Sequence, residues 1–165
     1  MRPVRFQQFA LALLADCEDV SAAAPWAEET RRPLGLHLTF QTGEQLWVAI
    51  TAVAAPGDTY QEDERRVFGD PPAAAAVTRI APGTLTPELA ARYLAVAMNR
   101  SGDREILKAY SYSDREMPAR HRGCGVRFHS GAKIHMLFEY VALPEKSRRP
   151  IPAVSAVRVP PSAQG

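Results

Sequence analysis

The sequence predicts an α+β protein in which two degenerate copies of a helix plus antiparallel three-strand unit lie around a pseudo-two-fold axis in a single compact fold. Three observations predict it: two amphipathic helical segments, a glycine-centred hairpin after each, and an alignment of the two hairpins without a gap. The first α-β-β-β unit is expected at residues 1–84 and the second at residues 85–162, with residues 163–165 as a tail.

The composition is that of one folded domain. The chain has 165 residues, of which 46% are hydrophobic and 23% charged, and a formal net charge of +2, which by itself indicates neither nucleic-acid nor membrane binding. Cys17 and Cys124 are the only cysteines, and no apolar run has the length of a membrane span. We therefore expect a cytoplasmic protein without a membrane partner, and the richness in Ala, Arg, Pro and Gly indicates a high-GC bacterial source.

The first unit is predicted to begin with a helix over residues 3–16, because Pro3 suits a first turn and apolar residues recur at helical spacing. A loop follows, with a short helical turn at residues 25–29 and Trp26 directed towards the interior. Residues 35–53 are predicted to form a hairpin, with Gly43 in the left-handed position of a three-residue loop. Its apolar face consists of Leu36, Leu38, Phe40, Leu46, Val48 and Ile50.

The second unit is predicted to follow an exposed loop and a strand at residues 76–80 that completes the first unit. Thr86 is suited to cap a helix that starts at Pro87 and ends near residue 101. Residues 103–110 are expected to form a short helix. The alternation of Tyr110 and Tyr112 fits an extended edge segment with one ring inward, or a stacking platform for bases.

The second hairpin is predicted at residues 123–141, with Gly131 in its turn. One face consists of Cys124, Val126, Phe128, Ile134, Met136 and Phe138, and the other of Arg127, Lys133, His135, Leu137 and Glu139. An apolar patch at residues 154–159 is expected to match the strand at 76–80.

The internal repeat rests on residue pairs at a constant offset. The hairpins pair Gly35 with Gly123, Phe40 with Phe128, Gly43 with Gly131, and Pro56 with Pro144. The helices pair Phe9 with Tyr93, and residues 79–82 match 158–161 more weakly. Any two hairpins with the same turn chemistry are similar, which is the alternative explanation, but three matching elements in one order favour duplication.

A basic stretch supplies the candidate site. No acidic residue occurs between Met117 and Phe138, a segment that carries Arg120, Arg122, Arg127, Lys133 and His135. Such a ribbon can bind an acidic partner or follow phosphates in a nucleic-acid groove. The alternative is an ordinary solvated face that pairs with the acidic stretch at residues 62–64.

The order of elements over roughly residues 86–141 resembles the helix-turn-helix and wing of winged-helix DNA-binding domains. It consists of a helix, a turn at residues 99–103, a short helix and a hairpin. The leading helix and strand that these domains place before the turn are not evident, so the chain is not assigned to the family. The resemblance supports nucleic-acid binding as an alternative function.

Metal and catalytic sites are not expected. His121, Cys124, His129 and His135 are permitted zinc ligands, but Cys124 and His135 are predicted on opposite faces of one hairpin. The sequence has no nucleophile elbow, phosphate-cradling loop or dinucleotide motif, and residues 111–114 near His121 are explained as loop-capping residues. We therefore predict a non-catalytic binding or assembly module without cofactors whose second hairpin engages an acidic partner, either a protein surface or a phosphate backbone. A nucleic-acid-binding protein is the second hypothesis and an enzyme of unrecognised type the third.

Overall fold

The computed structural model describes residues 1–116, 119–144 and 149–154. The elements in chain order are α1 (Pro3–Ala15), β1 (Val20–Pro25), β2 (Gly35–Phe40), β3 (Gln45–Val53), α2 (Pro87–Arg100), β4 (Ile106–Ser111), the 3-10 turn η1 (Tyr112–Asp114), β5 (Gly123–Phe128), β6 (Lys133–Ala142) and β7 (Arg149–Pro150). The predicted α+β class is confirmed.

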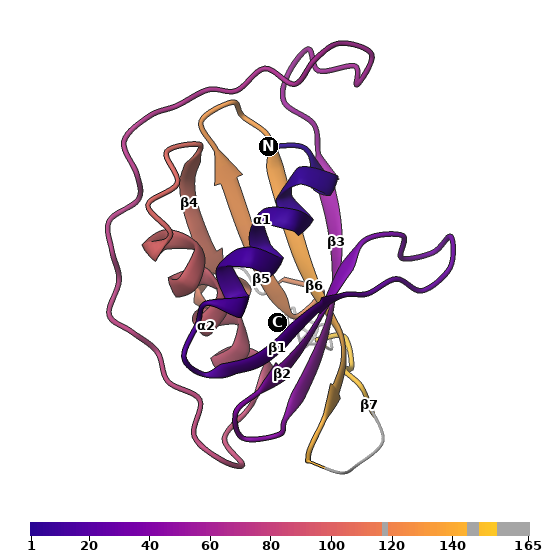
Figure 1. The fold of residues 1–165 in the computed structure, drawn as a ribbon. Helices are drawn as coiled ribbons and strands as arrows, with labels where there is room; N and C mark the ends of the chain where they lie inside the picture. The colour runs from indigo at the N-terminus through magenta and orange to yellow at the C-terminus, as the bar shows by residue number, and fades with distance from the viewer. Residues whose placement is uncertain (117–118, 145–148, 155–165) are drawn as a thin grey trace, which may run out of the picture.

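The strands form one antiparallel sheet that curls into a half-barrel. Its order is β1-β2-β3-β6-β5-β4, and the short β7 pairs with the part of β6 that runs beyond the end of β5. Strands β3 and β6 meet at the centre of the sheet, so each side holds three strands that follow one another in the chain. Both helices lie on the same face, which we call the inner face (Figure 1). The opposite face is called the outer face.

The inner face carries the hydrophobic core. Every residue predicted for the apolar faces of the two hairpins is buried. Phe6 of α1 meets Phe128 edge-on with ring centroids 6.2 Å apart, and Tyr93 of α2 meets Phe40 at 5.8 Å. Each helix therefore packs an aromatic ring against the hairpin on the other side of the sheet centre.

Both hairpins have the predicted register and turn. Leu38 pairs with Leu46 in the first hairpin, and Val126 pairs with Ile134 in the second. Gly43 and Gly131 have φ values of 83° and 87°, a left-handed backbone conformation that residues with a Cβ rarely adopt. The Thr86 side chain accepts a hydrogen bond from the Leu89 amide, so the predicted N-cap of α2 is confirmed.

The predicted position of the third strand in each unit, after the hairpin, was wrong. In the structure the third strand precedes the hairpin. Residues 20–25 form β1, and residues 106–111 form β4, where a short helix was predicted. The sequence 20–25 is rich in alanine and has weak strand propensity, but pairing with β2 outweighs that preference. No strand forms at residues 76–80, and the matching patch lies outside the described residues beyond Val154. Pro25 ends β1, and a bridge between Glu28 and Arg32 replaces the predicted helical turn.

Residues 54–86 cross the molecule without forming a helix or strand, and we call them the strap (Figure 1). The Gly69 amide donates to the Arg104 carbonyl, and the Arg100 side chain donates to the Ala75 carbonyl. Farther along, Arg79 pairs with Glu18 beside β1. The strap is thus attached to several elements that are distant in sequence. Among the described helices, neither is long and apolar enough to cross a membrane.

Candidate functional site

The second half of the outer face brings basic and aromatic side chains together. Arg127 and Lys133 are paired across β5 and β6, and both are exposed. His135 lies on the same face and is half-buried. The predicted grouping of these three residues on the face opposite the core is therefore correct.

The other two predicted residues lie elsewhere. Arg122 pairs with Glu88 in the first turn of α2, and both line a cavity of about 200 Å³ at the end of the sheet. Arg120 is exposed, and its carbonyl accepts a hydrogen bond from the Val154 amide. The basic stretch is continuous in sequence, but its cations are divided between the outer face and the segment that leads into β5.

Sequence reasoning missed two cations beside this group, Lys108 and Arg115. Lys108 lies on β4 and pairs in register with Arg127, while the Arg115 guanidinium lies 5.7 Å from the centre of the Tyr110 ring. The wrong helix assignment for residues 103–110 concealed Lys108. The alternation of Lys108 and Tyr110 was the signal that could have placed Lys108 on the same strand face as the ring, whereas Arg115 follows η1 and no strand pattern reaches it.

His135 on β6 is held in place by Tyr112, which lies on the other side of β5. Its Nδ1 lies 2.5 Å from the Tyr112 hydroxyl. Burial lowers the pKa of His135 below its ordinary value of 6.5, and the positive charges of Lys133 and Arg115 lower it further. The lowered pKa favours a neutral ring whose Nδ1 accepts a hydrogen bond from the Tyr112 hydroxyl, so His135 is held as an uncharged member of the basic face.

The strap contacts the turn of the second hairpin. His129 Nε2 lies 3.0 Å from the Asp70 carbonyl oxygen, and a Cβ on Gly69 would overlap the His129 ring. A Cβ on Gly131 would lie 2.9 Å from Pro56. The strap therefore lies against the end of the ribbon at which a wing would insert into a nucleic-acid groove, while Gly131 itself stays exposed.

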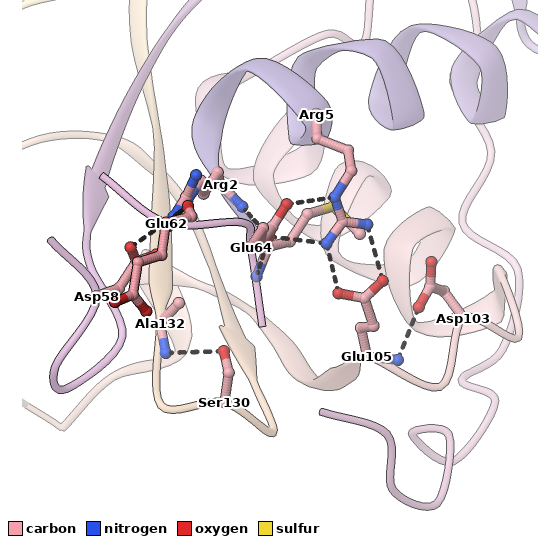
Figure 2. A network of polar contacts seen from close by, with 10 residues as sticks. Arg2, Arg5, Asp58, Glu62, Glu64, Asp103, Glu105, Ser130 and Ala132 are labelled. Atoms are coloured by element: carbon pink, nitrogen blue, oxygen red, sulfur yellow. Dashed lines mark hydrogen bonds and ion pairs between the residues drawn. The ribbon is translucent and has the colours of Figure 1, made fainter. Parts of the chain in front are cut away.

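Arg5 joins the strap to the body of the protein through two carboxylates (Figure 2). Its guanidinium donates two hydrogen bonds to Glu64 of the strap, at 2.6 and 2.8 Å. It donates two more to Glu105, at 2.7 and 2.6 Å. The Glu105 residue is only 5% exposed. One side chain of α1 therefore neutralises a carboxylate of the strap and a buried carboxylate at the start of β4.

The network extends to the first residues of the chain. The Arg2 amide donates to Glu64, and the Met1 ammonium lies 3.4 Å from the same carboxylate. Hydrogen bonds from Arg5 lower the pKa of Glu64 from its ordinary 4.5 to about 2. Burial lowers the pKa of the Met1 ammonium. Glu64 is thus bound by residues 1–5, so it is not the acidic partner of the basic hairpin that the alternative explanation required.

The candidate metal ligands and hydroxyl groups of the sequence are placed separately by the structure. No three His, Cys, Asp or Glu side chains of this part of the chain gather where they could hold a metal ion. Cys124 is fully buried on the inner face, and burial raises its pKa. The Ser111 and Ser113 hydroxyls lie 2.6 Å apart, and Ser111 accepts from the Ser113 amide. Ser111 is thus the N-cap of η1, in agreement with the loop-capping interpretation.

Comparison with known proteins gives no family: no protein-family model, curated protein or solved structure matches this chain. Any functional conclusion must therefore come from the chemistry of the surfaces described above.

Proposed function

We propose that this protein is a non-catalytic binding module and that the second half of its outer face engages an acidic partner protein. The observation that carries the proposal is the placement of Lys108, Arg127 and Lys133 together on a sheet face that neither helix covers. Within the described ranges none of the three forms an ion pair. Charges without intramolecular partners are available to an opposite charge on another molecule.

The outer face of the first hairpin lacks the positive charges to which the proposal assigns binding in the second hairpin. The residues equivalent to Arg127 and Lys133 in the first hairpin are Thr39 and Gln45, which are paired in register and neutral. The fold therefore accommodates uncharged residues at these positions, so packing does not explain the positive charge.

We also infer that the halves 1–84 and 85–162 are degenerate copies related by a pseudo-two-fold axis at the sheet centre. In the β3–β6 ladder Val48 pairs with Phe138 and Ile50 pairs with Met136. At the constant offset of the hairpin alignment, Val48 is equivalent to Met136 and Ile50 to Phe138. A two-fold rotation therefore converts the first pair into the second. The axis of that rotation would pass through the pair Ala49 and Leu137.

Reciprocal contacts at the two turns support the same axis. Gly43 faces Pro144, to which a Cβ would come within 3.3 Å, and Gly131 faces Pro56 at 2.9 Å. The two glycines are equivalent, and so are the two prolines, so one contact is the image of the other. On this interpretation the duplicated sheet is scaffold, and binding is confined to the copy that acquired charge.

The double variant Arg127→Thr and Lys133→Gln tests the proposed function, because it gives the second hairpin the residues of the first. Both side chains are exposed, so each change should alter the unfolding free energy by no more than about 0.5 kcal/mol. We expect the variant to leave an acidic column, such as poly-glutamate resin, at lower salt than the parent. The matched control is Arg31→Gln with Arg66→Gln, which removes the same charge from exposed sites elsewhere.

The same variants separate protein from nucleic-acid partners. Retention on short single- and double-stranded DNA is measured in parallel, and loss of two phosphate contacts would lower the slope of log affinity against log salt by about 2. A parent that binds DNA far more tightly than poly-glutamate, with that change in slope, would favour nucleic acid. Equal retention of the parent, the double variant and the control on every matrix would leave the basic face as ordinary solvated surface.

A further inference from the structure

A groove lies beside the basic face, between α2 and the edge strand β4. Its volume is about 450 Å³, within the usual size range of ligand pockets. Arg92 and Asn99 line it from α2, Lys108 and Tyr110 from β4, and Ala75 from the strap. Arg115 and Arg127 also line it, and we call this cavity the β4 groove.

The β4 groove is strongly positive. Its only acidic lining residue in the described chain is Asp114, which Arg92 binds at 3.0 Å. Lys108, Arg115 and Arg127 make no ion pair with any residue that the structure describes. The groove therefore presents unpaired positive charge, which is complementary to an anion.

Tyr110 holds two of these cations together. The Arg127 and Arg115 guanidiniums lie 5.6 and 5.7 Å from the centre of its ring. Gly125 allows this arrangement, because a Cβ there would come within 2.6 Å of the Tyr110 ring. Guanidinium groups held on an aromatic face keep their N–H donors free, and the planar fork matches a carboxylate.

The edge of β4 is closed to strand addition at its centre. The Asn99 side chain accepts from the Ala109 amide at 2.7 Å and donates to the Ala109 carbonyl at 2.9 Å. Asn99 thus forms hydrogen bonds with the backbone N–H and C=O of Ala109, the groups with which an added strand would pair. A molecule in the groove would therefore be recognised through side chains that reach Arg115 and Arg127.

We infer that the β4 groove binds an acidic peptide segment of a partner protein, with Asp or Glu carboxylates placed on Arg115 and Arg127. The inference rests on the proposed function and assigns it a subsite. A short acidic peptide is favoured over nucleic acid because the groove offers a small set of cations without an ion pair among the described residues, namely Lys108, Arg115 and Arg127, and the net charge of the chain is only +2, whereas nucleic-acid sites neutralise a longer run of phosphates. Nucleic-acid binding is one outcome of the test.

The test uses fluorescein-labelled hexaglutamate and an oligothymidylate of equal charge as probes, with the full-length protein at low salt and fluorescence anisotropy as the readout. Arg115→Gln should weaken hexaglutamate binding about fivefold, the equivalent of one exposed ion pair. Tyr110→Leu should weaken it comparably without any change in charge, whereas Tyr110→Phe keeps the ring and should bind like the parent. Arg31→Gln is the matched control, and melting temperatures verify that each variant is folded.

Each outcome decides between the two proposals. If Arg127→Thr with Lys133→Gln weakens binding while Arg115→Gln and Tyr110→Leu behave like Arg31→Gln, the basic face functions and the β4 groove is not its subsite. Tighter binding of oligothymidylate, weakened by the same groove variants, would assign the groove to nucleic acid and overturn the peptide inference. Absence of hexaglutamate binding by the parent at low salt would overturn both proposals.

Discussion

The junction between strap and body should depend on one side chain, Arg5. The substitution Arg5→Met keeps an unbranched side chain on α1 but removes four hydrogen bonds to two carboxylates. Glu64 and Glu105 would then be left close together without their shared cation. Breaking a buried ion pair from one side costs about 3–5 kcal/mol. Since the Arg5 side chain is 26% exposed, we expect a loss of about 3 kcal/mol, at the lower end of that range.

Chemical denaturation and acid titration measure this effect. The pKa of Glu64 is lowered to about 2 from its ordinary 4.5, so its stabilising contribution is complete above pH 4.5 and is lost as pH falls towards 2. The parent should therefore lose stability in that window, and the Arg5→Met variant should show a shallower loss. Trypsin should also cut faster after the exposed Arg65 and Arg66, because the strap would be less firmly held.

Two further variants distinguish the network from general charge effects. Arg79→Met removes a cation of the strap from an exposed pair and should change stability little. Adding Glu64→Gln and Glu105→Gln to Arg5→Met should restore part of the loss, since no carboxylate then remains uncompensated. If Arg5→Met matches the parent in unfolding free energy, acid profile and trypsin rate, the network does not anchor the strap.

The remaining predictions concern the core and the basic face. Truncation of Phe40 or Phe128 to Ala should each cost about 3–5 kcal/mol in denaturant unfolding, because both residues are at most 2% exposed; near-neutral results at both would contradict the packing described. His135 has a pKa below its ordinary 6.5 in the folded state, so stability should fall as pH decreases below 6.5, where the unfolded chain binds the proton more readily. His135→Gln should flatten that dependence in thermal melts at pH 5.5–7.5, and an unchanged profile would show that His135 does not cause it.

Local patterns were sufficient to predict both hairpins. A glycine in each turn fixes the loop, and alternation of apolar residues fixes the register, so a shift by one residue would expose the core face. The same pattern places Arg127, Lys133 and His135 on the opposite face. The N-cap Thr86 and the first-turn Pro87 similarly defined the start of α2.

Local sequence patterns did not predict the edge strands β1 and β4. Residues 20–25 have weak strand propensity. Residues 106–111 contain no glycine or proline that would have argued against a helical assignment. Both become strands because the neighbouring strand offers unpaired backbone groups, and that information is tertiary. The wrong assignment of β4 also concealed Lys108, and with it the groove beside α2.

The sequence by itself determined the α+β class, the two hairpins with their registers, and the separation of apolar from basic side chains, because turn chemistry and period-two alternation act between neighbours in the chain. Only the tertiary structure decided which cations lie together and which are already neutralised. Glu64 is far closer in sequence to the strap arginines than to Arg5, yet it binds Arg5 and not the basic hairpin. Ion pairs and pockets form between segments that the chain brings together on folding, so their partners depend on the path of the strap and on the order of strands in the sheet.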